Sequence, residues 1–184
     1  TDSATLNEND LAALRATGLT ESAGTSPSAP ALSVSGSIVD NVNWGADGFG
    51  SVSQIAIKAG TPVDVASGST TFYFKADGSL ISSTQTPGLT APSDTVASLL
   101  VNSGTGAYTW TLVDNLLVSG TADNLVNYIN STGVVLYGKD GDGDQIATGV
   151  QLQLNVVDDV PVTTTATDSA TLNENDLAAL RATG

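Results

Sequence analysis

The chain contains 184 residues, of which 40% are hydrophobic and 13% are charged, and its formal net charge is −14 at pH 7. This composition predicts one domain with a substantial core, and its acidic surface should attract cations and avoid nucleic acid and membranes. Cysteine and histidine do not occur in the sequence, which excludes disulfides, thiolate or imidazole ligands for zinc, and a nucleophile paired with histidine.

The first eighteen residues, TDSATLNENDLAALRATG, recur without a change at residues 167–184. An offset of 166 residues is too long for a solenoid repeat and suits one independently folding domain. We therefore expect one full unit of a tandem array followed by the opening of the next unit. Adjacent copies of the same repeat in the same chain are then the expected partners, and a spacer or display role is favoured over catalysis.

The N-terminal region divides into two parts. Residues 1–18 predict a first strand over 1–6 and a short helix from Asn7 to Gly18, a residue suited to ending a helix. Residues 19–31, rich in serine and proline, predict a linker. Because the eighteen-residue segment occurs at both ends, either copy could supply the first strand. We expect the N-terminal copy to do so.

Residues 32–160 are predicted to form the body of the domain, and residues 161–184 a linker and the opening of the next repeat. Apolar and polar residues alternate within short segments of the body, and Gly/Asp turns separate them. The predicted strands are 32–39, 52–58, 70–75, 79–85, 95–102, 107–114, 132–139 and 145–157. Residues 123–130 predict one or two helical turns. This pattern indicates an all-β fold, an antiparallel immunoglobulin-like β-sandwich with a short helix near the N-terminal strand.

The densest chemical motif is DGDGD at residues 140–144. Three carboxylates at alternate positions of a tight turn, Asp140, Asp142 and Asp144, place hard oxygen ligands close together, as Ca²⁺ requires. The motif is not an EF-hand, because Gln145 and Gln151 stand where that loop needs Gly and Glu. The alternative is a polar hairpin turn, for which Asp and Gly are the usual residues.

A second acidic pair, Asp158 and Asp159, follows the last predicted strand and precedes Pro161. Taken alone, this pair suits a solvated linker. In a sandwich, however, the predicted strand 145–157 spans about 40 Å and separates the pair from the DGDGD turn. Asp47, in the loop 40–50, should lie at the end with DGDGD, and Glu8 at the end with the acidic pair.

In a tandem array, the two acidic ends of successive units would face each other across a short linker. We expect Ca²⁺ to bridge them, since only a cation allows facing carboxylates to approach. The predicted metal ligands are Glu8, Asp47, Asp140, Asp142, Asp144, Asp158 and Asp159.

The nine aromatic residues mostly alternate within predicted strands, which favours packing roles over a sugar platform. Trp44, in the Gly/Asp loop 40–50, is the aromatic residue that could contact a glycan. An alternative function is therefore a glycan- or surface-binding module that acts by avidity. No catalytic constellation is recognisable, and we expect no enzymatic activity.

Three segments together resemble the repeats of giant RTX adhesins, biofilm-associated proteins that Gram-negative bacteria export by type I secretion. They are GSIVDNVNWGADGFGSVSQI, GAYTWTLVDNL and KDGDGDQIATGVQLQLNVVDDVP, which lie between residues 36 and 161. The resemblance implies an immunoglobulin- or cadherin-like extender module with calcium at its joints, secreted and displayed at the cell surface. The region 7–30 is longer than a minimal extender requires.

Overall fold

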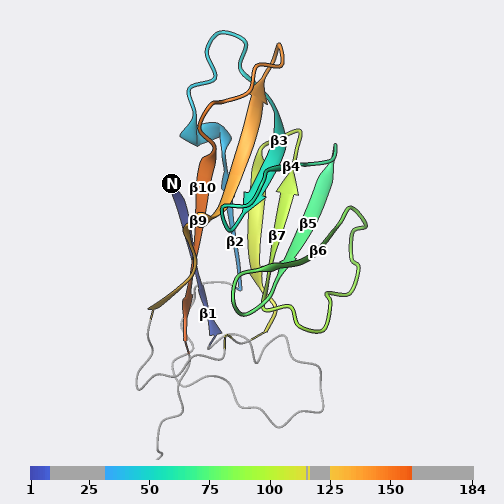
Figure 1. Cartoon of the computed structure of the whole chain (residues 1–184), viewed down its shortest axis with the longest axis vertical. Helices are drawn as coiled ribbons and strands as arrows, with labels where there is room; N and C mark the ends of the chain where they lie inside the picture. The colour runs from blue at the N-terminus through green and yellow to red at the C-terminus, as the bar shows by residue number, and fades with distance from the viewer. Residues whose placement is uncertain (9–31, 115, 117–124, 159–184) are drawn as a thin grey trace, which may run out of the picture.

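Two five-stranded sheets pack face to face in an elongated β-sandwich (Figure 1). The computed structural model describes residues 1–8, 32–114, 116 and 125–158. Sheet 1 has the strand order β1-β10-β9-β3-β4, and sheet 2 has the order β2-β8-β7-β5-β6. The predicted all-β sandwich is therefore confirmed.

The strands are β1 (Asp2–Asn7), β2 (Ser33–Ser37), β3 (Phe49–Ile57), β4 (Val63–Asp64), β5 (Ser69–Phe74), β6 (Leu80–Thr84), β7 (Ala97–Asn102), β8 (Ala107–Leu112), β9 (Leu125–Asp140) and β10 (Val150–Val157). One short 3-10 helix, η2 (Val39–Asn41), follows β2. Neighbouring strands are antiparallel, except that β1 runs parallel to β10 at the edge of sheet 1.

The N-terminal copy of the repeated segment forms β1, as expected. Its register pairs Asp2 with Leu152 and Asn7 with Val157. Ala4 and Leu6 point into the core, so this strand contributes packing as well as backbone hydrogen bonds. The predicted helix over 7–18, the linker over 19–31 and the C-terminal copy lie outside the described residues, apart from Asn7 and Glu8.

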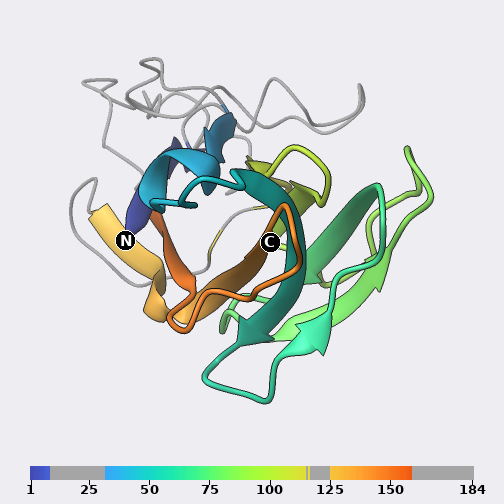
Figure 2. The same cartoon turned by 90° about the horizontal axis from the view of Figure 1, so that it is seen from above.

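The core lies between the two sheets and follows the alternation in the sequence. In β10, every second residue is buried, because side chains of a strand point alternately to its two faces. Burying one such Leu or Val contributes about 1.5–3 kcal/mol. From sheet 2, the Phe74 and Trp110 rings meet at a centroid distance of 5.5 Å. Seen along the long axis in Figure 2, the strands of both sheets surround this shared interior.

Two predictions were wrong in the segment that leads through β9 to β10, while other predicted strand ends differ from the structure by up to three residues. Residues 125–130 belong to β9 and are not helical, because Val126 and Ile129 pair with β10 in the ladder of sheet 1. The last strand begins at Val150, not at residue 145, and spans about 26 Å. Gln145 is bridged to Lys139, and Val150 pairs with Leu136. More residues lie between Gln145 and Val150 than between Leu136 and Lys139 on the opposite strand, so the extra residues loop out.

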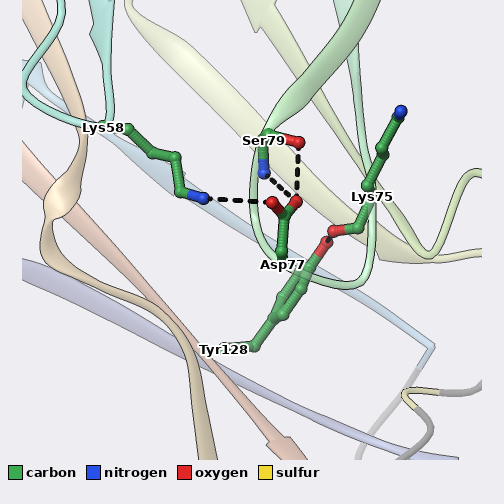
Figure 3. A network of polar contacts seen from close by, with 5 residues as sticks. All are labelled: Lys58, Lys75, Asp77, Ser79 and Tyr128. Atoms are coloured by element: carbon green, nitrogen blue, oxygen red, sulfur yellow. Dashed lines mark hydrogen bonds and ion pairs between the residues drawn. The ribbon is translucent and has the colours of Figure 1, made fainter.

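A polar network joins the two sheets near the turn between β5 and β6 (Figure 3). The Ser79 backbone N–H and hydroxyl donate to Asp77 Oδ1 at 2.9 and 2.6 Å. Lys58, which follows β3 in sheet 1, lies 3.4 Å from Asp77 Oδ2. The Tyr128 hydroxyl of β9 donates to the Lys75 carbonyl oxygen. The network thus fastens the β5–β6 hairpin of sheet 2 to sheet 1.

In the part of the chain that the structure describes, we find no helix that combines the length and the apolar character needed to cross a lipid bilayer.

Candidate metal site

We call the end of the sandwich that carries the loop 42–48 and the turn 140–144 the upper end (Figure 1). The end of β9 and the start of β3 form this region, since Phe49 pairs with Asp140. The loop that enters β3 is thereby held against the turn that leaves β9. The prediction that Asp47 lies beside the DGDGD turn is confirmed.

Asp47, Asp140 and Asp142 form an acidic cluster at the upper end. One carboxylate oxygen from each residue lies within 4.8 Å of those of the other two. Asp140 is half-buried, whereas Asp47 and Asp142 are exposed. Asp144 does not join this cluster through its carboxylate. Its backbone N–H instead donates to Asp140 Oδ1 at 2.8 Å, and its carbonyl oxygen accepts from the Asp140 N–H at 3.0 Å.

Two glycines allow the backbone segments of the upper end to approach each other. The Gly141 N–H donates to the Gly48 carbonyl oxygen at 3.0 Å, and a Cβ at Gly141 would lie 2.4 Å from the Asp47 carbonyl oxygen. A Cβ at Gly50 would lie 2.0 Å from the Asp140 carbonyl oxygen. The motifs of the sequence did not indicate that these two glycines are determinants of the site. The feature of the sequence that could have identified them is their position beside the acidic residues of both loops.

The carboxylates of the upper end interact strongly with one another. A hydrogen bond to Asp140, followed by the negative charges of Asp140 and Asp144, raises the pKa of Asp142. The same hydrogen bond, with Asp142 as its donor, is the largest cause that lowers the pKa of Asp140. The two carboxyl groups are therefore close enough to share a proton. A bound cation would relieve the same repulsion.

The upper cluster fits a hard divalent cation. Ca²⁺ binds oxygen ligands at 2.3–2.6 Å, and oxygens around one ion are then at most about 5 Å apart. The separation of up to 4.8 Å within the cluster agrees with this limit, and all three ligands are carboxylates. Asp47, Asp140 and Asp142 are thus the residues that would hold the ion, and Asp144 would act through its backbone by orienting Asp140.

The lower end, where β1 and β10 finish together, carries a second acidic pair. Because Asn7 pairs with Val157 in the parallel ladder, the next residues, Glu8 and Asp158, follow side by side. Both are buried, with exposed fractions of 7% for Glu8 and 4% for Asp158. The prediction that these two residues share one end is confirmed, while Asp159 lies outside the described residues.

The two acids of the lower end differ in their partners. Glu8 Oε1 accepts a hydrogen bond from the Leu116 backbone N–H. Asp158 Oδ2, by contrast, is buried and has no hydrogen-bond partner among the residues that the structure describes. A buried carboxylate oxygen without a partner is costly unless a cation or donor reaches it. Asp158 therefore also fits a cation ligand.

The structure thus separates the predicted ligands into two groups. Asp47, Asp140 and Asp142 meet at the upper end, Glu8 and Asp158 meet at the lower end, and the whole length of β10 lies between them. Within a single unit the two groups cannot share an ion.

Trp44 has a packing role in the loop of the upper end. Its ring contacts Phe49 edge-on at a centroid distance of 5.0 Å, and its Nε1–H donates to the Val39 carbonyl oxygen at 3.1 Å. A Cβ at Gly138 would lie 2.5 Å from the indole ring, so the ring also covers the backbone of β9. These contacts weaken the observation on which the glycan prediction was based.

Comparison of the chain with models of protein families, with curated proteins and with solved structures gave no match.

Proposed function

We propose that this chain is a calcium-stiffened extender unit of a bacterial surface adhesin, repeated in tandem to hold a distal ligand-binding region away from the cell. The observation that carries the proposal is the placement of two acidic groups at opposite ends of one elongated sandwich. The exact repetition of residues 1–18 at 167–184 supports a tandem arrangement.

In such an array, the lower end of one unit precedes the upper end of the next. Glu8 and Asp158 of the first unit would then approach Asp47, Asp140 and Asp142 of the second. Facing groups of carboxylates repel one another in the absence of a cation. Ca²⁺ supplies the charge and accepts the oxygen ligands, and the residues of both ends orient those ligands, so that the joint becomes stiff.

The parallel edge strand and the antiparallel body are compatible with an immunoglobulin-like sandwich, the finer fold assignment that we propose. A chain without cysteine suits export in an unfolded state and folding outside the cell, where calcium is abundant. Within the cell, unscreened carboxylates at both ends would oppose premature folding. Secretion to the cell surface is therefore the location we propose.

Small-angle scattering on a chain of two complete units tests the mechanism. We expect a longer maximum dimension with Ca²⁺ than with a chelator, because the bridged joint holds the units in line. A chain with Asp142→Asn in the second unit and Asp158→Asn in the first should remain short in calcium.

Asp94→Asn in both units is the matched control, since it removes the same number of charges from an exposed turn. Equal dimensions with calcium and with chelator in the unsubstituted chain would reject the stiffening mechanism.

A further inference from the structure

β1 occupies the edge of sheet 1 beside β10. The chain contains two copies of the segment that fits this edge, residues 1–8 and 167–174. We propose that the C-terminal copy of one molecule, residues 167–174, occupies this site on a second molecule, so that neighbouring chains exchange their first strands. This inference does not depend on calcium and goes beyond the extender function.

β1 is an edge strand held by one neighbour. It forms a ladder with β10 over six residues, and the ladder is parallel, a pairing slightly less stable per residue than an antiparallel one. In sheet 1, the other side of β10 is paired with β9. Releasing β1 therefore opens one edge of the sheet and leaves the rest of the sheet paired.

The site on the body is specific for the sequence of β1. Ala4 and Leu6 fill the core beside β10, with exposed fractions of 4% and 0%. The Asp2 carboxylate accepts a hydrogen bond from Asn41 Nδ2 at 3.2 Å, and the Thr1 hydroxyl donates to Gln151 at 3.1 Å. At the other end, Glu8 accepts from the Leu116 N–H.

Each of these contacts has its counterpart in the C-terminal copy, because the sequence TDSATLNE recurs at 167–174. Leu172 corresponds to Leu6, Ala170 to Ala4 and Glu174 to Glu8. The two copies must therefore bind the site with the same intrinsic affinity. Which copy occupies it is decided by the concentration at which each is presented.

The second molecule is a better source of the strand than the chain's own C-terminus. β10 ends at the lower end of the sandwich, whereas a parallel strand must start beside Leu152 at the opposite end of the ladder. Residues 159–166 alone connect Asp158 to Thr167. Parallel neighbours usually need a crossover of a dozen or more residues, so this connection is short for a return within one chain.

Competition between the two copies sets the expected concentration dependence. A binding segment that is covalently joined to its site reaches an effective concentration on the order of 1 mM. The N-terminal copy should therefore dominate in dilute solution. Occupation of the site by the C-terminal copy of a second molecule should become comparable to occupation by the N-terminal copy when the chain refolds at about that concentration.

Disulfide trapping in the full chain tests the proposal, because no native cysteine interferes. In the ladder, Thr5 pairs with Asn155, and Thr171 is the residue of the second copy that corresponds to Thr5. The variant Asn155→Cys/Thr171→Cys, refolded at rising concentration and then oxidised, should form linked dimers and larger species. Asn155→Cys/Thr5→Cys is the control and should close within one chain in dilute solution.

Disabling one copy gives a second measurement. Leu6→Asp should shift the chain from monomer to concentration-dependent oligomers, as measured by analytical ultracentrifugation, because residues 167–174 replace the damaged strand. Leu172→Asp should stay monomeric. Leu6→Asp/Leu172→Asp should be monomeric with a lower melting temperature than Leu6→Asp.

Two results would overturn the proposal. The first is a 155–171 disulfide within one chain together with a monomeric Leu6→Asp variant, which would identify the chain's own C-terminus as the occupant. The second is identical mass and melting temperature for Leu6→Asp and the double variant with no 155–171 disulfide, which would show that the second copy does not bind.

Discussion

At the residue scale, Asp142 is a carboxyl group that the surrounding carboxylates disfavour in its charged form. Its pKa is raised by the hydrogen bond with Asp140 and then by the negative charges of Asp140 and Asp144. Because the pKa of Asp142 is higher in the folded state than its ordinary value of 3.8, the folded domain loses stability as the pH rises from about 3.8 through the folded-state pKa. At neutral pH, this repulsion opposes folding whenever no cation is bound.

We predict that Asp142→Asn has opposite effects in two buffers. In a chelator, it should raise the melting temperature slightly, because one of the facing charges is removed. In calcium, it should remove most of the calcium-dependent increase in melting temperature, because one of the three ligands is lost. Asp94→Asn, which changes the same charge far from the cluster, should show neither effect in thermal unfolding followed by circular dichroism.

A second prediction concerns the backbone contact at the upper end. Gly141→Ala should destabilise the domain by about 1–3 kcal/mol, because the new methyl group would meet the Asp47 carbonyl oxygen. Gly104→Ala is the control, since its Cβ would lie 3.7 Å from Asn102 Oδ1 in ordinary contact. Equal unfolding free energies for both variants in urea titrations would contradict this account of the site.

The sequence was sufficient to place Asp47 with the 140–144 turn and Glu8 with Asp158, but not to predict which carboxylates of the turn join the upper cluster. Asp140, Asp142 and Asp144 alternate along the turn, and this pattern predicts three equivalent ligands. The hydrogen bonds of the Asp144 backbone turn that residue into a support for Asp140 instead. Such a choice depends on the local backbone path, which the pattern of residue types does not specify.

At the element scale, the network around Asp77 links a hairpin to the opposite sheet. Hydrogen bonds from the Ser79 hydroxyl and backbone, with a smaller contribution from Lys58, lower the pKa of Asp77 from 3.8 to about 2. Because the folded-state pKa is lowered, the stabilisation is present above pH 3.8 and is lost as the pH falls through about 2.

We predict an order of effects on the Asp77 carboxyl, measured by NMR titration. Ser79→Ala should raise its pKa more than Lys58→Met does, because the Ser79 hydrogen bond is the largest cause of the shift. The Lys58 ammonium lies at 3.4 Å and is about half exposed, so solvent screens its charge. A larger effect of Lys58→Met would show that charge, not hydrogen bonding, controls this turn.

Strands were predictable where alternation and turn chemistry agree. The hairpins around Asp77-Gly78 and around Ser103 to Gly106 lie where the sequence placed them. Residues 125–130 were misassigned because their spacing suits either a helix or a strand, and pairing with β10 decided between the two. The parallel pairing of β1 with β10 was not predictable, since β1 and β10 lie at opposite ends of the chain.

At the scale of the whole molecule, the net charge of −14 makes stability sensitive to ions. We predict that Ca²⁺ raises the melting temperature of the 184-residue chain more than NaCl of equal ionic strength. A specific ion at 100 times its Kd contributes about 2.7 kcal/mol, which corresponds to about 5–10 °C for a domain of this size. Equal shifts for both salts would indicate screening alone, without a specific site.

The parallel arrangement of β1 and β10 has a mechanical consequence. Thr1 lies beside the start of β10, and Asp158 follows its far end, so tension applied between these two residues would slide one strand along the other. The hydrogen bonds of the ladder would then be loaded in shear and resist together, whereas strands peeled apart from one end break their bonds one at a time. A force that pulls along the chain would thus act on this unit in the direction in which the β1–β10 ladder resists best.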